Sequence, residues 1–178
     1  MGPKPDRKTE RNRRRSGHAA MEMGLVMMPT FALICGFLDI GMALFTWGTL
    51  QNAVREGTRF AITYQMNGES SHDTAIKKVV QQYAMNLVKA NDSPPRIFIN
   101  YFDRSDLSTP LTGPNSNRPN TVVEVSIQGY PWNRIAPFSG TIAHPPYSST
   151  STPLQLSLYS ASIMGGFPMG TNASNFPR

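Results

Sequence analysis

The sequence contains few of the residues on which most enzyme chemistry depends. Among 178 residues, the single cysteine, Cys35, excludes an intrachain disulfide and a metal cluster held by several thiolates. The three histidines, His18, His72 and His144, are scattered, and neither an H-E-x-x-H nor a G-x-S-x-G or P-loop motif occurs. We therefore expect no metal site, no cofactor and no enzymatic activity.

Charged residues are nearly missing from one long stretch of the chain. From Met23 to Trp47, Asp39 is the only formal charge in 25 residues. A helix of this length, at about 1.5 Å per residue, can cross a hydrocarbon core of about 30 Å. The stretch exceeds the apolar region of a secretory signal, which has about 7 to 15 residues, and no small-residue cleavage site follows it. The pattern predicts one transmembrane helix.

Positive charge is concentrated just before this helix. Residues 1–17 hold seven of the 17 Lys and Arg residues but only two of the 11 acids, which leaves ten basic and nine acidic residues for the remainder. A basic cluster can bind nucleic acid, but one that adjoins a membrane helix sets its orientation instead. We expect no nucleic-acid partner, a cytoplasmic N-terminus and an extracytoplasmic chain after about residue 48. The arginines that determine this topology are Arg11, Arg13, Arg14 and Arg15.

The remaining sequence predicts a small α+β domain. Residues 73–90 have apolar side chains at helical spacing, which predicts an amphipathic helix capped by Ser71 or Asp73. Three segments are rich in strand formers or alternate in polarity, and they predict a three-stranded antiparallel sheet packed on that helix: 96–102, 121–128 and 154–164. The Pro-, Gly- and Asn-rich residues 103–120 predict a loop.

A short motif stands where the basic leader meets the apolar helix. It reads Arg-Ser-Gly17-His18-Ala-Ala-Met-Glu22, and its Gly-x4-Glu spacing resembles the prepilin peptidase signal. The helix then continues into TLQNAVREGTR, residues 49–59. Together, residues 17–61 resemble the TadE-like family, except that Asp39 stands where that family usually has Glu. The resemblance implies cleavage after Gly17, which would make His18 the mature N-terminus.

The resemblance also implies a function in a tight-adherence, type IV-related pilus. Because the chain is longer than the major subunits of such pili usually are, a minor pilin or pseudopilin-like component with a pilin-like fold is expected. It would act in pilus assembly or cell adhesion, anchored in the bacterial inner membrane with its C-terminal domain in the periplasm or in an extracellular pilus. The implied partners are prepilin peptidase, other pilin or pseudopilin subunits in a homo- or hetero-oligomer, and pilus platform proteins.

Two carboxylates lie in or beside the membrane helix, where a charge at the bilayer centre costs about 2.5 to 3.5 kcal/mol or more. The resemblance implies that Glu22 pairs with the processed N-terminal amine of His18, in the same or a neighbouring subunit. Glu22 can also complement the helix dipole as a cap. Asp39 either contacts a helix of a partner subunit or lies near the outer interface of the membrane, where its carboxylate reaches water.

One alternative function shares every hydrophobic feature of this chain. An uncleaved single-pass signal-anchor protein with an extracytoplasmic binding domain would have the same helix but would not need Gly17 or Glu22. The expected organisation is otherwise a basic leader, a transmembrane and extended N-terminal helix, an extracytoplasmic domain and a flexible tail, at residues 1–17, 18–66, 67–164 and 165–178.

Overall fold

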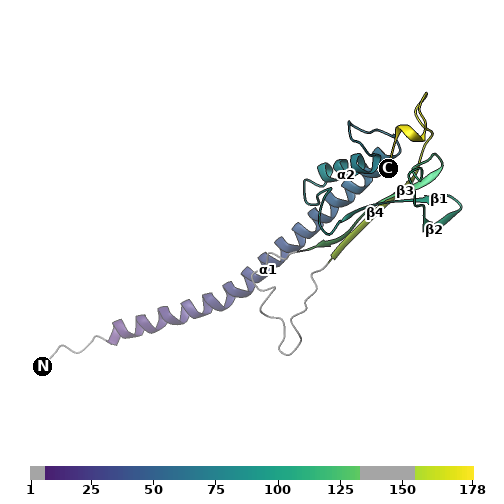
Figure 1. Ribbon diagram of the computed structural model, residues 1–178. Helices are drawn as coiled ribbons and strands as arrows, with labels where there is room; N and C mark the ends of the chain where they lie inside the picture. Colours follow the sequence, from purple (N-terminus) through teal and green to yellow (C-terminus); the bar gives the residue numbers. More distant parts are fainter. Residues whose placement is uncertain (1–6, 133–154) are drawn as a thin grey trace. The chain divides into compact units, whose positions relative to one another are not determined.

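The computed structural model describes residues 7–132 and 155–178, with side chains from His18 onward and without that of Ala173. The elements, labelled in Figure 1, are α1 (Arg7–Ala61), α2 (His72–Tyr83), β1 (Ile97–Asp103), β2 (Asp106–Pro110), β3 (Thr121–Pro131), β4 (Gln155–Ile163) and a 3₁₀ turn at Ala173–Asn175. The chain divides into two units, and the boundary falls within α1, between Met42 and Ala43.

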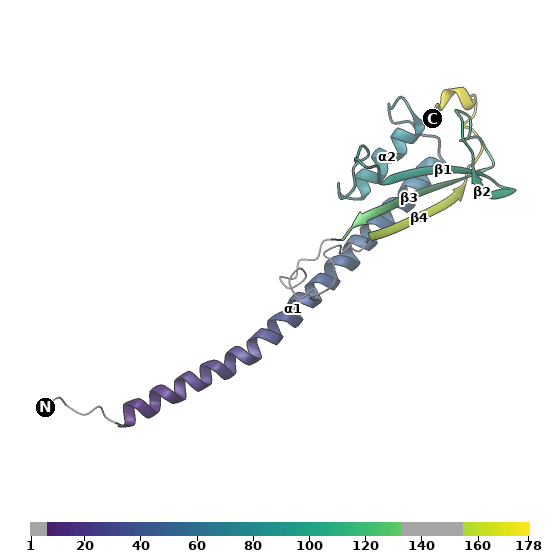
Figure 2. The ribbon, with the colours of Figure 1, turned by 60° about the horizontal axis from the view of Figure 1, so that its bottom comes forward.

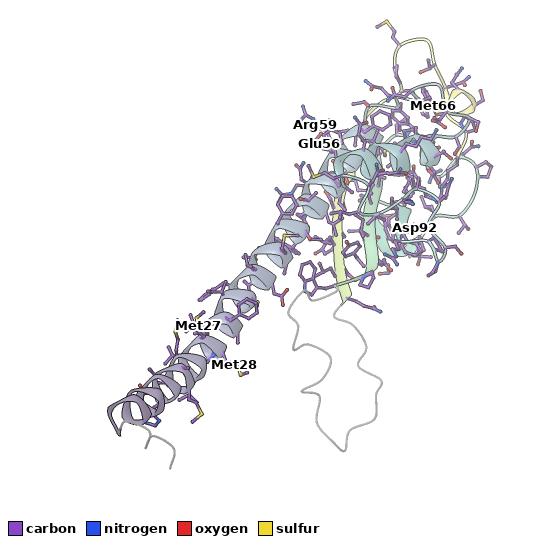
Figure 3. All side chains as sticks on the ribbon, turned by 90° about the vertical axis from the view of Figure 1, so that its left-hand side faces the viewer. Met27, Met28, Glu56, Arg59, Met66 and Asp92 are labelled. Atoms are coloured by element: carbon purple, nitrogen blue, oxygen red, sulfur yellow. The ribbon has the colours of Figure 1, made fainter. Side chains whose placement is uncertain are left out.

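After the basic leader, the part of α1 in the first unit carries mostly apolar side chains. Large side chains from Met21 to Met42 are 45% or more exposed, and Figure 3 shows Met27 and Met28 projecting away from the helix. Pro29 lies inside this helix, and the next residue, Thr30, donates a side-chain hydrogen bond of 2.8 Å to the Val26 carbonyl. Pro29 has no N–H for the Leu25 carbonyl, and membrane helices tolerate a proline of this kind.

The second unit contains a four-stranded antiparallel sheet in the order β2-β1-β3-β4. The prediction of three strands was wrong by one, because the expected loop 103–120 contains β2 (Figure 2). All five residues of β2 are exposed, so it has no alternation of buried and exposed positions from which a strand could be predicted. The three predicted strands are present as β1, β3 and β4.

The core lies between the helices and one face of the sheet. Alternate residues of β3 are fully buried, namely Val123, Val125 and Ile127, and they pack in one cluster with Ile76 and Val80 of α2. The last turns of α1 contribute Leu50, Ala53, Val54 and Ala61 to the same cluster. The C-terminal part of α1 is therefore a structural element of the domain as well as the continuation of the membrane segment.

The helix expected over residues 73–90 ends earlier than predicted. After Tyr83 the chain turns through Met85 and Asn86, whose φ angles are 52° and 60°. The Met85 N–H donates to the Gln82 carbonyl and the Asn86 N–H to the Gln81 carbonyl, each at 3.1 Å, which is the Schellman pattern of a helix end. Glycine usually occupies the position of Met85 in this motif, so the sequence did not mark the end of the helix.

The segment expected to be a flexible tail has defined contacts in the structure. Phe176 is 7% exposed and packs against Tyr64, with 5.2 Å between the ring centres. The Pro177 carbonyl accepts a 2.8 Å hydrogen bond from the His72 N–H, at the first residue of α2. Ser71, expected as a cap, occupies the N-cap position without a side-chain hydrogen bond. The C-terminal segment therefore supplies an acceptor to the start of α2.

Candidate functional site

The junction between the basic leader and the apolar segment is helical throughout. Helix α1 begins at Arg7 and continues through the Gly17–His18 peptide bond. The four arginines assigned to topology lie within this helix, but their side chains are outside the described part of the chain: Arg11, Arg13, Arg14 and Arg15. The structure thus places the expected processing site in the backbone of a continuous helix.

Glu22 lies one turn after His18 on the same side of α1. The His18 Nε2 and Glu22 Oε1 atoms are 3.7 Å apart, a distance that forms an ion pair when the imidazole is protonated, and the two side chains are 76% and 72% exposed. Because α1 begins at Arg7, Glu22 is about four turns inside the helix. It can cap the helix only in a chain that has been cut to begin at His18, so the two interpretations of Glu22 both require processing.

Asp39 is half-buried and belongs to a distinct stripe of α1. Ala43, Thr46 and Leu50 follow it at spacings of four, three and four residues, and Thr46 and Leu50 are 5% and 0% exposed. Residues at these spacings share one face of a helix. By this spacing Asp39 shares a helix face with Ala43 and Thr46, and a role in contact with a partner helix stays a prediction.

The motif TLQNAVREGTR forms the wall of α1 that faces the domain. Leu50, Ala53, Val54, Gly57 and Thr58 are buried, whereas Asn52, Arg55 and Arg59 are exposed. Figure 3 shows Glu56 and Arg59 near each other on α1, with 4.0 Å between their charged atoms. The resemblance noted in the sequence thus includes the residues that join the membrane helix to the domain.

Gly57 is the point of closest approach between α1 and α2. A Cβ atom at this position would overlap the Cγ2 methyl of Val80 and would lie 3.6 Å from Val125. Thr58 follows, and its hydroxyl is 2.9 Å from the Val54 carbonyl and 3.2 Å from the Ser160 carbonyl of β4. A small residue at position 57 is therefore required for the observed packing of α2 on α1.

A buried polar network lies at the other end of the domain. The Tyr101 hydroxyl donates to Asp73 Oδ1 at 2.9 Å, and Arg178 Nε donates to Asp73 Oδ2 at 3.0 Å. The guanidinium carbon of Arg178 also lies 4.7 Å from the centre of the Tyr101 ring. This network could not be predicted from the sequence, because Tyr101 and Arg178 are 28 and 105 residues from Asp73 and the three residues follow no motif.

His72 is fully buried beside this network. Its ring stacks on Tyr64 at 5.7 Å, its Nδ1 is 3.5 Å from the Tyr101 hydroxyl, and its Nε2 has no hydrogen-bond partner among the described residues. Burial lowers the pKa of His72, and this outweighs the opposite effect of Asp73. Burial also raises the pKa of Tyr64 to about 12 and that of Tyr101 far above its usual range.

This network has a structural role in the fold. Its donors and acceptors are satisfied mainly within the protein, and Arg178 additionally donates to the Ile99 and Leu111 carbonyls and to Ser116 Oγ. Within residues 7–132 and 155–178, no group of three or more His, Cys, Asp or Glu side chains is arranged to hold a metal ion. The network connects the C-terminal segment to α2 and the sheet.

Comparison with known proteins identifies the N-terminal segment. Residues 17–59 match the family model described as TadE-like protein, so the predicted resemblance is confirmed over this part of the chain. No curated protein and no solved structure is similar enough to the chain to count as a match. The match begins at Gly17 and ends in the motif that packs on the domain.

The match and the helix define a class of protein. The described part of the chain has one helix long and apolar enough to cross a membrane, within His18–Ala61, and its most apolar window is not buried in the protein. That helix suggests a single-pass membrane anchor. The TadE-like segment associates the chain with tight-adherence pilus systems.

Proposed function

We propose that this protein is a minor pilin or pseudopilin-like component of a tight-adherence pilus and not an enzyme. The observation that carries the proposal is the position of the TadE-like match, which begins at Gly17, where the basic leader meets the apolar helix. The helix is anchored in the bacterial inner membrane with the arginines on the cytoplasmic side, and the α+β domain is periplasmic.

Processing after Gly17 would give Glu22 a partner of opposite charge. Side chains on a helix point toward its N-terminus, and Glu22 is four residues, or about 6 Å of helix rise, from His18. A new amine at His18 would therefore be within reach of the Glu22 carboxylate, in its own subunit or in a neighbour. Pairing would offset the cost of holding a carboxylate at the membrane boundary. At the bilayer centre this cost is about 2.5 kcal/mol or more.

The partners in this proposal are prepilin peptidase, other pilin or pseudopilin subunits and the pilus platform proteins. The exposed apolar surface of α1 supports assembly as well as anchoring, because it is available to other membrane helices when the subunit leaves the lipid. The half-buried Asp39, on the helix face that it shares with Ala43 and Thr46, is a candidate contact for such a helix.

The test is N-terminal sequencing and intact-mass analysis of the full chain expressed with and without the cognate prepilin peptidase. We expect a peptidase-dependent N-terminus at His18, lost in Gly17→Ala and retained in Gly24→Ala, a matched change in the same helix where the added methyl has open space. An unprocessed chain in every sample would instead support the uncleaved signal-anchor protein.

A further inference from the structure

A groove in the second unit lies between α1 and the end of α2. Its α1 wall is formed by Leu44, Phe45, Gly48, Thr49 and Asn52, and its other wall by Gln82, Tyr83 and Met85. Two of the largest apolar side chains on α2 and its terminal turn are exposed here, since Tyr83 is 46% and Met85 is 68% exposed. Exposed apolar side chains that line one groove can mark a binding surface, whereas single ones such as Leu107 and Met169 are common on protein surfaces.

The groove is located at the end of the domain nearest the membrane segment. Helix α2 begins at His72, which stacks on Tyr64 just after α1, and it ends beside Gly48, so it runs back along α1 toward the apolar residues. Figures 1 and 2 both show α2 alongside this part of α1. Tyr83 and Met85 therefore lie beside Leu44 to Asn52, where α1 enters the second unit.

Helix geometry gives the level of the groove relative to a bilayer. If Glu22 marks the inner boundary, about 20 residues of helix cross the hydrocarbon core, so its outer edge falls near Met42 to Leu44. The headgroup layer then covers the next several residues of α1, where the exposed Trp47 is a typical interfacial residue. The α1 wall of the groove begins at the hydrocarbon edge and passes through this layer.

We propose that phospholipid occupies this groove, and that Tyr83 and Met85 anchor the domain to the outer interface of the membrane. Tyrosine suits this zone because its ring is apolar and its hydroxyl is polar. Methionine at 85 is held outward by a left-handed φ of 52°, a conformation for which glycine is usual, and no core contact accounts for a large side chain there. The proposal depends on the membrane anchoring in the proposed function and adds a second, peripheral contact to it.

The test uses spin labels on the full chain in phospholipid vesicles, in a Cys35→Ala background. Labels are placed by Leu38→Cys in the membrane segment, Met85→Cys in the groove and Met169→Cys as a matched methionine control. Met169 is fully exposed and belongs to the segment that packs at Tyr64. Tyr64 follows the end of α1 at Ala61, which is 13 residues, or about 20 Å of helix rise, beyond Gly48. Collisions with oxygen report lipid, and collisions with a water-soluble nickel chelate report solvent.

We expect the ratio of oxygen to nickel accessibility at position 85 to be severalfold higher than at 169 and lower than at 38. A label at 85 that matches 169, while 38 reports hydrocarbon, would overturn the lipid contact and leave the membrane anchor intact. A label at 38 that reports solvent would overturn both. Spin-spin broadening at 85 that disappears on dilution with unlabelled protein would place a second copy in the groove and also overturn the proposal.

Discussion

Gly57→Ala tests the packing of α1 on the domain, because the helix propensity and the packing predict effects of opposite sign. In an exposed helix the change stabilises by about 0.8 to 1 kcal/mol. At Gly57 the added methyl would overlap Val80, a β-branched side chain with little rotamer freedom, in a fully buried site. Overpacking of this kind costs about 1 to 3 kcal/mol, so after the gain in helix propensity we expect a net loss of up to about 2 kcal/mol.

The matched control is Gly48→Ala, the same substitution in the same helix at a site where a Cβ atom meets nothing within 4 Å. This variant is expected to be as stable as the parent or more stable by up to about 1 kcal/mol. Thermal unfolding of the full chain in detergent micelles is followed by near-ultraviolet circular dichroism in the tyrosine band, because all six tyrosines lie after residue 60. For a domain of this size, about 1 kcal/mol corresponds to a shift in Tm of about 4 °C or more.

A second variant separates the Val80 overlap from other causes. Val80→Ala alone creates a cavity and destabilises, but in combination with Gly57→Ala it removes the methyl group that the new Cβ would meet. The double variant is therefore expected to lose less stability than the sum of the two single losses. If Gly57→Ala raised Tm as Gly48→Ala does, or if the losses were additive, the close approach of α1 and α2 would not be as described.

Three further predictions concern the buried end of the domain. Because the pKa of His72 is lowered in the folded protein, the unfolded chain binds a proton at a higher pH than the folded protein does, near 6.5. The free energy of unfolding should therefore decline from pH 7 to pH 5.5, and it should decline less in His72→Gln. Urea unfolding at each pH measures this difference. Phe176→Ala should destabilise by about 3 kcal/mol or more, seen as a lower Tm, and unchanged stability would show that the C-terminal segment is not packed. The pKa of Tyr64 is about 12, and that of Tyr101 is higher. Tyrosinate absorbance at pH 11 should therefore show that at least two of the six tyrosines are still protonated while the domain is folded. Complete ionisation of the tyrosines without unfolding would contradict the burial of these two side chains.

The elements predicted best were those with a regular polarity pattern. The alternation in 121–128 and 154–164 corresponds to β3 and β4, because one face of the sheet is buried against the helices and the other is not. The apolar run from Met23 to Trp47 lies entirely within α1, because a run of this length and composition is recognised without reference to any other part of the chain. Where the pattern was absent, as in the fully exposed β2, the strand was missed.

The remaining differences come from contacts between distant residues. Met85 ends α2 in a conformation that its side chain does not favour, so no local residue marked the stop. Arg178 and Phe176 lie in a segment without periodicity, and only the fold brings them to Asp73 and Tyr64. At the processing junction, Gly17 and Glu22 were identified by their spacing, whereas the network around His72 has no spacing to identify.

The sharing of α1 between anchor and core limits how the domain can be released from a cell. Leu50, Ala53, Val54 and Ala61 belong to the core, yet they follow within a few residues of the apolar segment. A sheddase that cut between Val54 and Ala61 would remove Leu50, Ala53 and Val54 from the core, and the fragment that left the membrane would lose stability. In the proposed function, incorporation into a filament would instead release the domain together with the whole helix.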